Sequence, residues 1–112
     1  MKPPLLNRSL TLEDPQQLAD GSGGFATTWV TLGALWAEVT AGSGRERAGR
    51  GTTLSRVPFK ITVRAAPAGA SSRPKPNQRF RDGDRVFAIL AVSERDPTGK
   101  YLLCHTEEET VA

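Results

Sequence analysis

Cys104 and His105 are the only cysteine and the only histidine of the 112-residue chain, and they are adjacent. A thiol activated by an imidazole requires the two side chains to face each other. Neighbours on a strand point to opposite faces, so the pair does not predict a catalytic dyad. A zinc site normally has four ligands, which this pair cannot supply. We therefore expect no metal, no cofactor and no enzymatic activity.

The acidic residues also give no indication of catalysis. Two carboxylates that share acid–base work stand at a fixed separation in a cleft, whereas the Asp and Glu residues here are scattered, mostly in predicted turns. The run 107–109 is interpreted as a solvated tail, with contact to a basic face of a neighbouring subunit as the alternative. The glycines at 42–49 lack the strand, lysine and helix of a phosphate-binding loop.

Basic residues concentrate in the middle of the chain. The segment 41–81 contains ten basic residues and one acid, Glu46, and carries a charge of +9. The remainder carries −6, which leaves the net charge of +3. Such an uneven distribution of charge along the chain indicates complementary surfaces, either between copies of the chain or toward a polyanion.

The length predicts a single domain over 1–112. A domain of this size buries only about two-thirds of the surface that its unfolded chain exposes, so stabilisation by partner subunits is expected. The lone cysteine excludes an internal disulfide. No apolar run is long enough for a signal peptide or a membrane span, which predicts a soluble protein made in the cytoplasm.

Alternating polar and apolar residues predict five or six short strands and no long helix. The first covers 8–13 and should end at Asp14–Pro15, because proline cannot donate to a ladder. The segment 85–92 is apolar on both faces, so we expect it to be the central, most buried strand. The other extended segments are 25–32 continuing into 35–40, then 56–64, 78–81 and 101–105.

Turns and loops separate these strands. Tight turns are predicted at Asp20–Gly24, Asp82–Gly83 and Asp96–Gly99. Long loops are expected at about 41–55, with a short helical turn possible at 45–48, and at 65–79. The pattern predicts an all-β chain that forms a small antiparallel β-barrel or sandwich.

Three stretches resemble the phage head–tail joining, or head completion, family. They are Leu6–Glu13, residues 20–46, and residues 80–92 with 101–104. The most specific part combines a Gly-Gly turn, a Trp a few residues later and Trp-Ala-Glu-Val at 36–39. The likeness extends from Leu6 to Glu107, and residues 20–39 are similar to the connectors of gene transfer agents, the phage-like particles of some bacteria.

The resemblance implies a small β-barrel with long loops that assembles as a ring, called a connector or stopper, at the virion neck. Its partners would be further copies in a cyclic ring compatible with six-fold symmetry, portal and adaptor proteins on the head side, and tail terminator or tail-tube proteins on the tail side. Packaged double-stranded DNA would pass through the channel, and no membrane is involved. The barrel form with five to six strands is therefore the expected fold.

Candidate subunit or channel contacts are Trp36, Arg45, Arg47, Arg50, Arg73, Lys75 and Arg79. The basic loops could line the DNA channel, because arginine contacts phosphate without reading sequence; the alternatives are solvent or acids of a neighbouring subunit. The second loop is expected to be an extended arm that orders on assembly, with a disordered surface loop as the alternative. Trp36 lies opposite the apolar face of 35–39, which favours a subunit contact, whereas Trp29 is predicted in the core.

A nucleic-acid-binding barrel of the OB or SH3-like type is the alternative function. The +9 segment supports it. Single-strand binders, however, stack bases on exposed aromatic residues. The basic loops contain none, and Phe59 is predicted on the apolar face of its strand, so the connector is the preferred interpretation.

Overall fold

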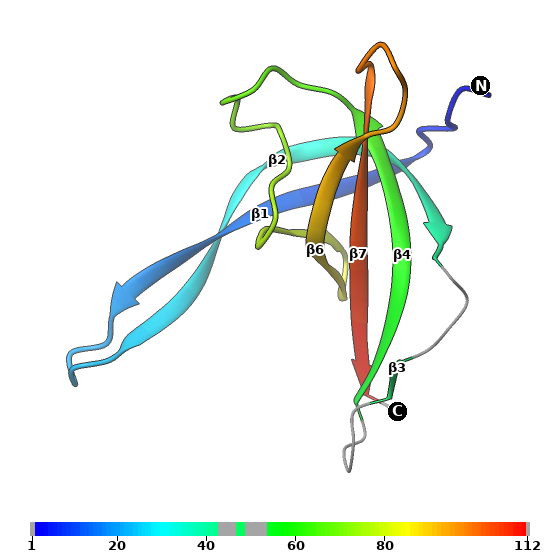
Figure 1. The fold of residues 1–112 in the computed structure, drawn as a ribbon. Coiled ribbons are helices and arrows are strands. Elements are labelled where there is room, and N and C mark those ends of the chain that lie inside the picture. The colour runs from blue at the N-terminus through cyan, green and yellow to red at the C-terminus, as the bar shows by residue number, and fades with distance from the viewer. Residues whose placement is uncertain (1, 43–46, 49–53, 112) are drawn as a thin grey trace.

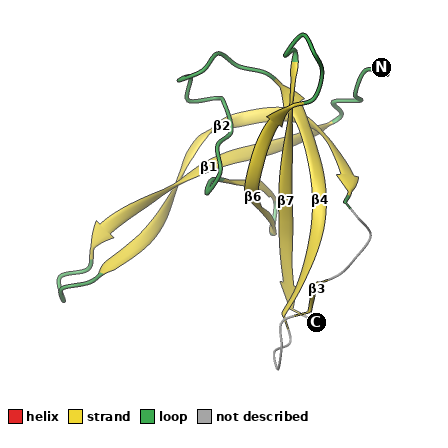
Figure 2. Cartoon of the chain, in the orientation of Figure 1, coloured by secondary structure: helices red, strands yellow, loops and turns green. Residues whose placement is uncertain are grey.

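The computed structural model describes residues 2–42, 47–48 and 54–111, which form seven strands and no helix (Figures 1 and 2). The strands are β1 (Arg8–Ala19), β2 (Phe25–Ala41), β3 (Arg47–Ala48), β4 (Leu54–Arg64), β5 (Arg79–Asp82), β6 (Arg85–Glu94) and β7 (Tyr101–Val111). Across these described residues, nothing forms a helix that could cross a membrane.

Six of the strands close into one antiparallel ring. Their order is β2-β1-β5-β6-β7-β4, and β2 returns to pair with β4, Ala37–Ala41 opposite Phe59–Val63. The two-residue β3 adds to the end of β4. The predicted all-β, barrel-like fold is therefore confirmed. β1, with 12 residues, is twice as long as predicted, whereas β2, with 17 residues, joins the predicted segments 25–32 and 35–40 into one strand.

The core lies inside this ring, and every long strand contributes to it. Alternation places one face of each strand inward. The fully buried apolar residues are Leu10, Leu12, Ala37, Ile61, Val63, Phe80, Phe87, Ile89, Leu102 and Cys104. His105 is exposed beside the buried Cys104, as the prediction of opposite faces requires.

The first strand does not end at Pro15, which corrects the prediction. β1 continues to Ala19, paired with β2 throughout. Beyond Glu13, β2 is its only strand partner among the described residues, so the missing N–H of Pro15 costs no ladder bond on the open side. Residues 14–19 and 25–31, with the turn 20–24, form a two-stranded ribbon, here called the arm, that projects from the body (Figure 1).

A β-bulge marks the point where the arm leaves the closed sheet. Leu12 pairs with Gly33 and Glu13 pairs with Thr31, so Leu32 is the extra residue. Gly33 has a φ of 147°, which favours glycine. Bulges bend a strand and increase its twist. The bulge therefore directs β2 out of the ring.

The predicted burial of the segment 85–92 is wrong for one of its faces. Phe87 and Ile89 are buried, but Ala88, Leu90 and Ala91 are exposed. Leu90 is the extra residue of a second bulge, because Ile89 pairs with Thr106 and Ala91 with His105. The apolar outer face of β6 is thus left uncovered in the single chain.

The loop 65–78 is folded into turns, and the prediction of an extended arm is wrong. The N–H of Ala70 donates to the carbonyl of Pro67, and that of Arg73 to the carbonyl of Ala70. Pro74 is fully buried beneath them. In the first loop, Arg47 lies in β3, not in a helical turn, and the residues on either side at 43–46 and 49–53 lie outside the described part.

Phe87→Ala is expected to lower the free energy of unfolding by about 3–5 kcal/mol, because it leaves a cavity next to Phe59, whose ring centroid is 5.4 Å away. Leu90→Ala on the exposed side of the same strand is the control, with an expected change below about 0.5 kcal/mol. Urea denaturation of the isolated chain measures both. Equal losses would contradict the burial pattern.

Burial raises the pKa of the Cys104 thiol from an ordinary value near 9 to about 12. Below pH 9 the thiol is protonated in both the folded and unfolded chain. Between about pH 9 and 12, only the unfolded chain loses the thiol proton. The free energy of unfolding should therefore fall over this range by up to about 1.4 kcal/mol per pH unit. Subtracting the pH profile of Cys104→Ala isolates this contribution, and parallel profiles would contradict it.

Candidate interaction surfaces

A buried carboxylate holds the base of the arm. The Glu13 side chain is 3% exposed. Its Oε1 lies 2.6 Å from Arg79 Nε, and its Oε2 lies 3.2 Å from Arg81 Nη2. Both arginines come from β5, whose register places them opposite β1 at the bulge. A buried carboxylate is stable only when it is paired and hydrogen-bonded. Glu13 therefore fixes β5 to β1 where the arm begins.

Trp29 completes this base and is not a core residue, contrary to the prediction. The Arg79 guanidinium lies over its ring, 3.9 Å from the centroid. Such stacking is favourable because the ring face is electron-rich. Trp29 is half-buried by this contact and lies outside the core cluster. We name Glu13, Trp29, Arg79 and Arg81 the hinge cluster.

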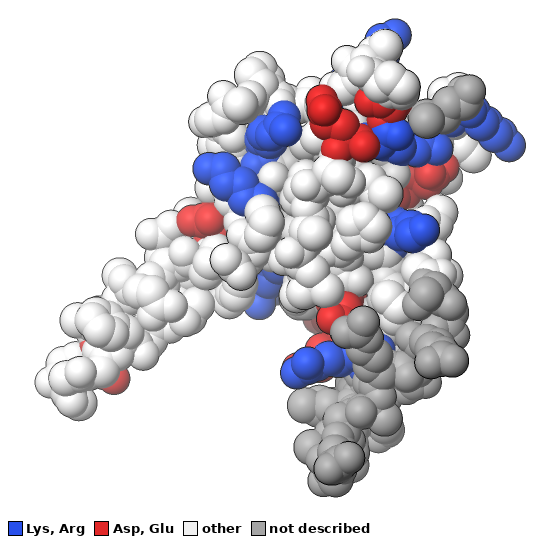
Figure 3. All heavy atoms as spheres, in the orientation of Figure 1, with Lys and Arg blue, Asp and Glu red and all other residues white. Residues whose placement is uncertain are grey.

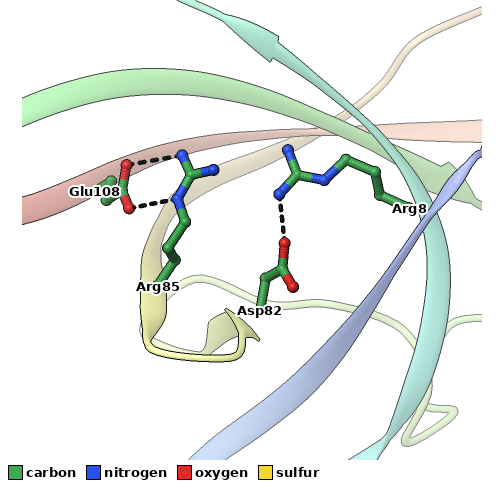
Figure 4. Close-up of polar contacts among 4 residues, drawn as sticks. All are labelled: Arg8, Asp82, Arg85 and Glu108. Atoms are coloured by element: carbon green, nitrogen blue, oxygen red, sulfur yellow. Dashed lines mark hydrogen bonds and ion pairs between the residues drawn. The ribbon is translucent and has the colours of Figure 1, made fainter.

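The β5–β6 turn is fixed on both sides by ion pairs (Figure 4). Asp82, which precedes the turn, accepts from Arg8 of β1. Arg85, which follows it, donates through Nε and NH2 to the two oxygens of Glu108, at 2.8 and 3.0 Å. This hydrogen bonding raises the pKa of Arg85. Glu108 is buried within β7, so the prediction of a solvated tail at 107–109 is wrong.

Part of the charge asymmetry is satisfied within the chain. Three arginines of the basic segment pair with acids outside it: Arg79 and Arg81 with Glu13, and Arg56 with Glu109. The Arg56–Glu109 pair is exposed on both sides and contributes little to stability. Lys60 and Lys75 are exposed and make no ion pair with a described residue.

The arm exposes apolar side chains and almost no charge. Phe25 is 72% exposed, Leu18 54% and Val30 45%. Asp20 is the only charged residue from Pro15 to Ala37, and its Oδ1 accepts from the N–H groups of Ser22 and Gly24 in the turn. Charged side chains are correspondingly sparse over the arm in Figure 3. Asp14 at its base and Asp20 in its turn are the charged residues of the arm, which exposes Phe25 on one side and Leu18 and Val30 on the other. A ribbon with so little charge is typical of an interaction site.

The outer face of β6 is the second uncovered apolar surface. Val86, Ala88, Leu90 and Ala91 form an outward row, and Leu90 is 53% exposed. Three adjoining hollows share Leu90 and Glu107; one extends to Trp29 at the base of the arm, and another to Pro58 and Lys60. We name this surface, the row with its hollows, the β6 face.

The predicted contact residues that the structure describes with side chains lie on β2, in the loop 65–78 and on β5. Trp36 is 62% exposed on β2, as a subunit contact requires. In the loop 65–78, Arg73 NH1 donates to the Ala66 carbonyl at 2.7 Å, and Lys75 is exposed. Arg79 belongs to the hinge cluster. Arg45 and Arg50 lie outside the described residues, and only the backbone of Arg47 is described.

Sequence reasoning missed the arm and the hinge cluster. The signal available was the charge-free stretch 21–37, which has no acidic or basic residue in 17 positions. Glu13 gave a weaker signal, an acid that follows the two inward leucines of the first strand.

Glu13→Gln is expected to lower the free energy of unfolding by about 2–3 kcal/mol, because it leaves Arg79 and Arg81 without their shared carboxylate. Glu109→Gln is the matched control, since it removes an exposed pair and should cost less than about 1 kcal/mol. Thermal or urea unfolding compares the two variants. Similar losses would show that Glu13 is not a structural anchor.

The comparisons with known proteins agree with the sequence resemblance. The family model of the phage head completion protein matches residues 1–109. A chain in the solved structure of the virion of a native gene transfer agent particle is 59% identical, with a TM-score of 0.87; the match covers 98% of this chain and 100% of that one. A search of curated proteins found no match. The chain therefore belongs to the phage head completion protein family, whose members are virion structural proteins and not enzymes.

Proposed function

We propose that the chain is a ring-forming head-to-tail connector at the virion neck, which joins the portal–adaptor complex to the tail and helps to retain packaged DNA. The observation that carries this proposal is the 59% identity, over almost the whole of both chains, to a chain of a gene transfer agent virion. Membership of the head completion family supports the same role.

The fold suits such a role because its body is stiff and its uncovered surfaces are apolar. A closed sheet with paired turns holds its shape under load from neighbouring rings. Apolar surface on the arm and on the β6 face needs a partner, since interfaces between subunits are depleted in charge at their centre. The chain therefore presents docking surfaces for neighbouring subunits.

The predicted contact residues take different parts in this proposal. Trp36 is assigned to a subunit contact. The loops with Arg45, Arg47 and Arg50 and with Arg73 and Lys75 are assigned to the channel or to an adjoining ring, where basic side chains would meet phosphate or acidic residues. Arg79 is assigned to the base of the arm, because its guanidinium pairs with Glu13 and stacks on Trp29.

A strain that lacks this chain should make DNA-filled heads without attached tails, and the chain supplied from a plasmid should restore tailed particles. Negative-stain electron microscopy counts the two kinds of particle. Normal numbers of tailed particles in the deletion strain would contradict the connector role. Tight, salt-sensitive binding of free DNA by the isolated chain would favour the nucleic-acid-binding alternative.

A further inference from the structure

The arm is built to contact something other than its own body. Isolated two-stranded ribbons are marginally stable in water, and exposed strand edges are normally protected by charges or proline. Along β2, residues 25–36 contain neither, and β4 joins this strand only from Ala37 onward. The hinge cluster holds the ribbon away from the body, so the chain cannot cover the arm itself.

The chain also carries a surface that fits the arm. Six residues of an arm strand span about 20 Å, and the row from Val86 to Ala91, six residues with a bulge at Leu90, is slightly shorter. Residues 15–19 and 25–31 of the arm contain no charged residue, and the row on β6 is apolar, with Glu107 of β7 beside it. At its tip the arm carries the acidic Asp20, and the exposed Lys60 lies at the Ala91 end of the β6 face, so these two charges can pair there; Glu109 lies at the opposite end of the face.

We propose that the arm of one copy lies across the β6 face of the next copy, with Phe25 seated in the hollows around Leu90. The inference rests on the proposed ring. Phe25 is the most exposed large apolar residue of the described part, and buried aromatic anchors dominate interface energies. The contact joins different surfaces of identical chains, and such head-to-tail contacts close into rings when the rotation between copies is fixed.

The hinge cluster then has a role beyond stability. It sets the angle between the arm and the body, and that angle sets the rotation from one copy to the next. Glu13, buried between two arginines, permits little change in this angle. The ring size is thus encoded at the base of the arm.

A cross-linking experiment in assembled particles tests the proposal. Alternation and register place Thr27 on the same side of the arm as Phe25, and Ala91 lies on the β6 face. Particles assembled from the double variant Thr27→Cys and Ala91→Cys, treated with a short bis-maleimide, should give a ladder of dimers and higher multiples of the chain. Each single variant should give none, and the native Cys104 is buried and does not interfere.

Phe25→Glu provides a second, independent test, because it places a charge where the proposal expects an apolar anchor. It should reduce incorporation of the chain into particles about tenfold or more. Thr28→Glu, on the opposite side of the same strand, is the matched control and should incorporate normally. Both positions are exposed, so thermal unfolding should show that both variants fold.

The outcomes separate the inference from the proposed function. Cross-links to a protein of different mass, or no ladder from particles that contain the chain, would overturn the arm-to-face contact and leave the connector role standing. Equal incorporation of Phe25→Glu and Thr28→Glu would do the same. Absence of the wild-type chain from purified particles would instead refute the connector role.

Discussion

The ion pairs of Glu13 with Arg79 and Arg81 are the contact on which the shape of the molecule depends. On one side of this carboxylate, β1 is a wall of a closed sheet; on the other it is half of a free ribbon. A carboxylate buried to this extent must keep both arginines, so β5 cannot separate from β1 there. Stacking of Arg79 on Trp29 extends the same constraint to β2.

The distribution of apolar residues along the strands explains both the closed sheet and the uncovered surfaces. A chain of 112 residues has little to spare for a core, and here one side of each strand fills it. Exposed large apolar residues lie on the arm, on the outer face of β6 and at Leu5 and Trp36, where they gain little in the single chain. Assembly with neighbours accounts for this arrangement better than folding does.

The features predicted correctly are those decided by residues that are close together in the sequence. The alternation of 56–64 and the Asp82–Gly83 turn were found because the residues that decide them are adjacent in sequence. The end of β1 was missed, because a proline stops a strand only where another strand needs its N–H, and that depends on the tertiary fold. The outer face of β6 was predicted as buried and is exposed; an apolar segment cannot indicate whether its own core or a neighbour covers it.

The most direct measurement is an electron cryomicroscopy map of the neck of particles that contain this chain, at a resolution that shows side chains. The account predicts a ring in which each arm leaves its own body at the hinge cluster and places Phe25 against Leu90 of the adjacent copy. An arm that lies in solvent, folds onto its own body or contacts only another protein would contradict it.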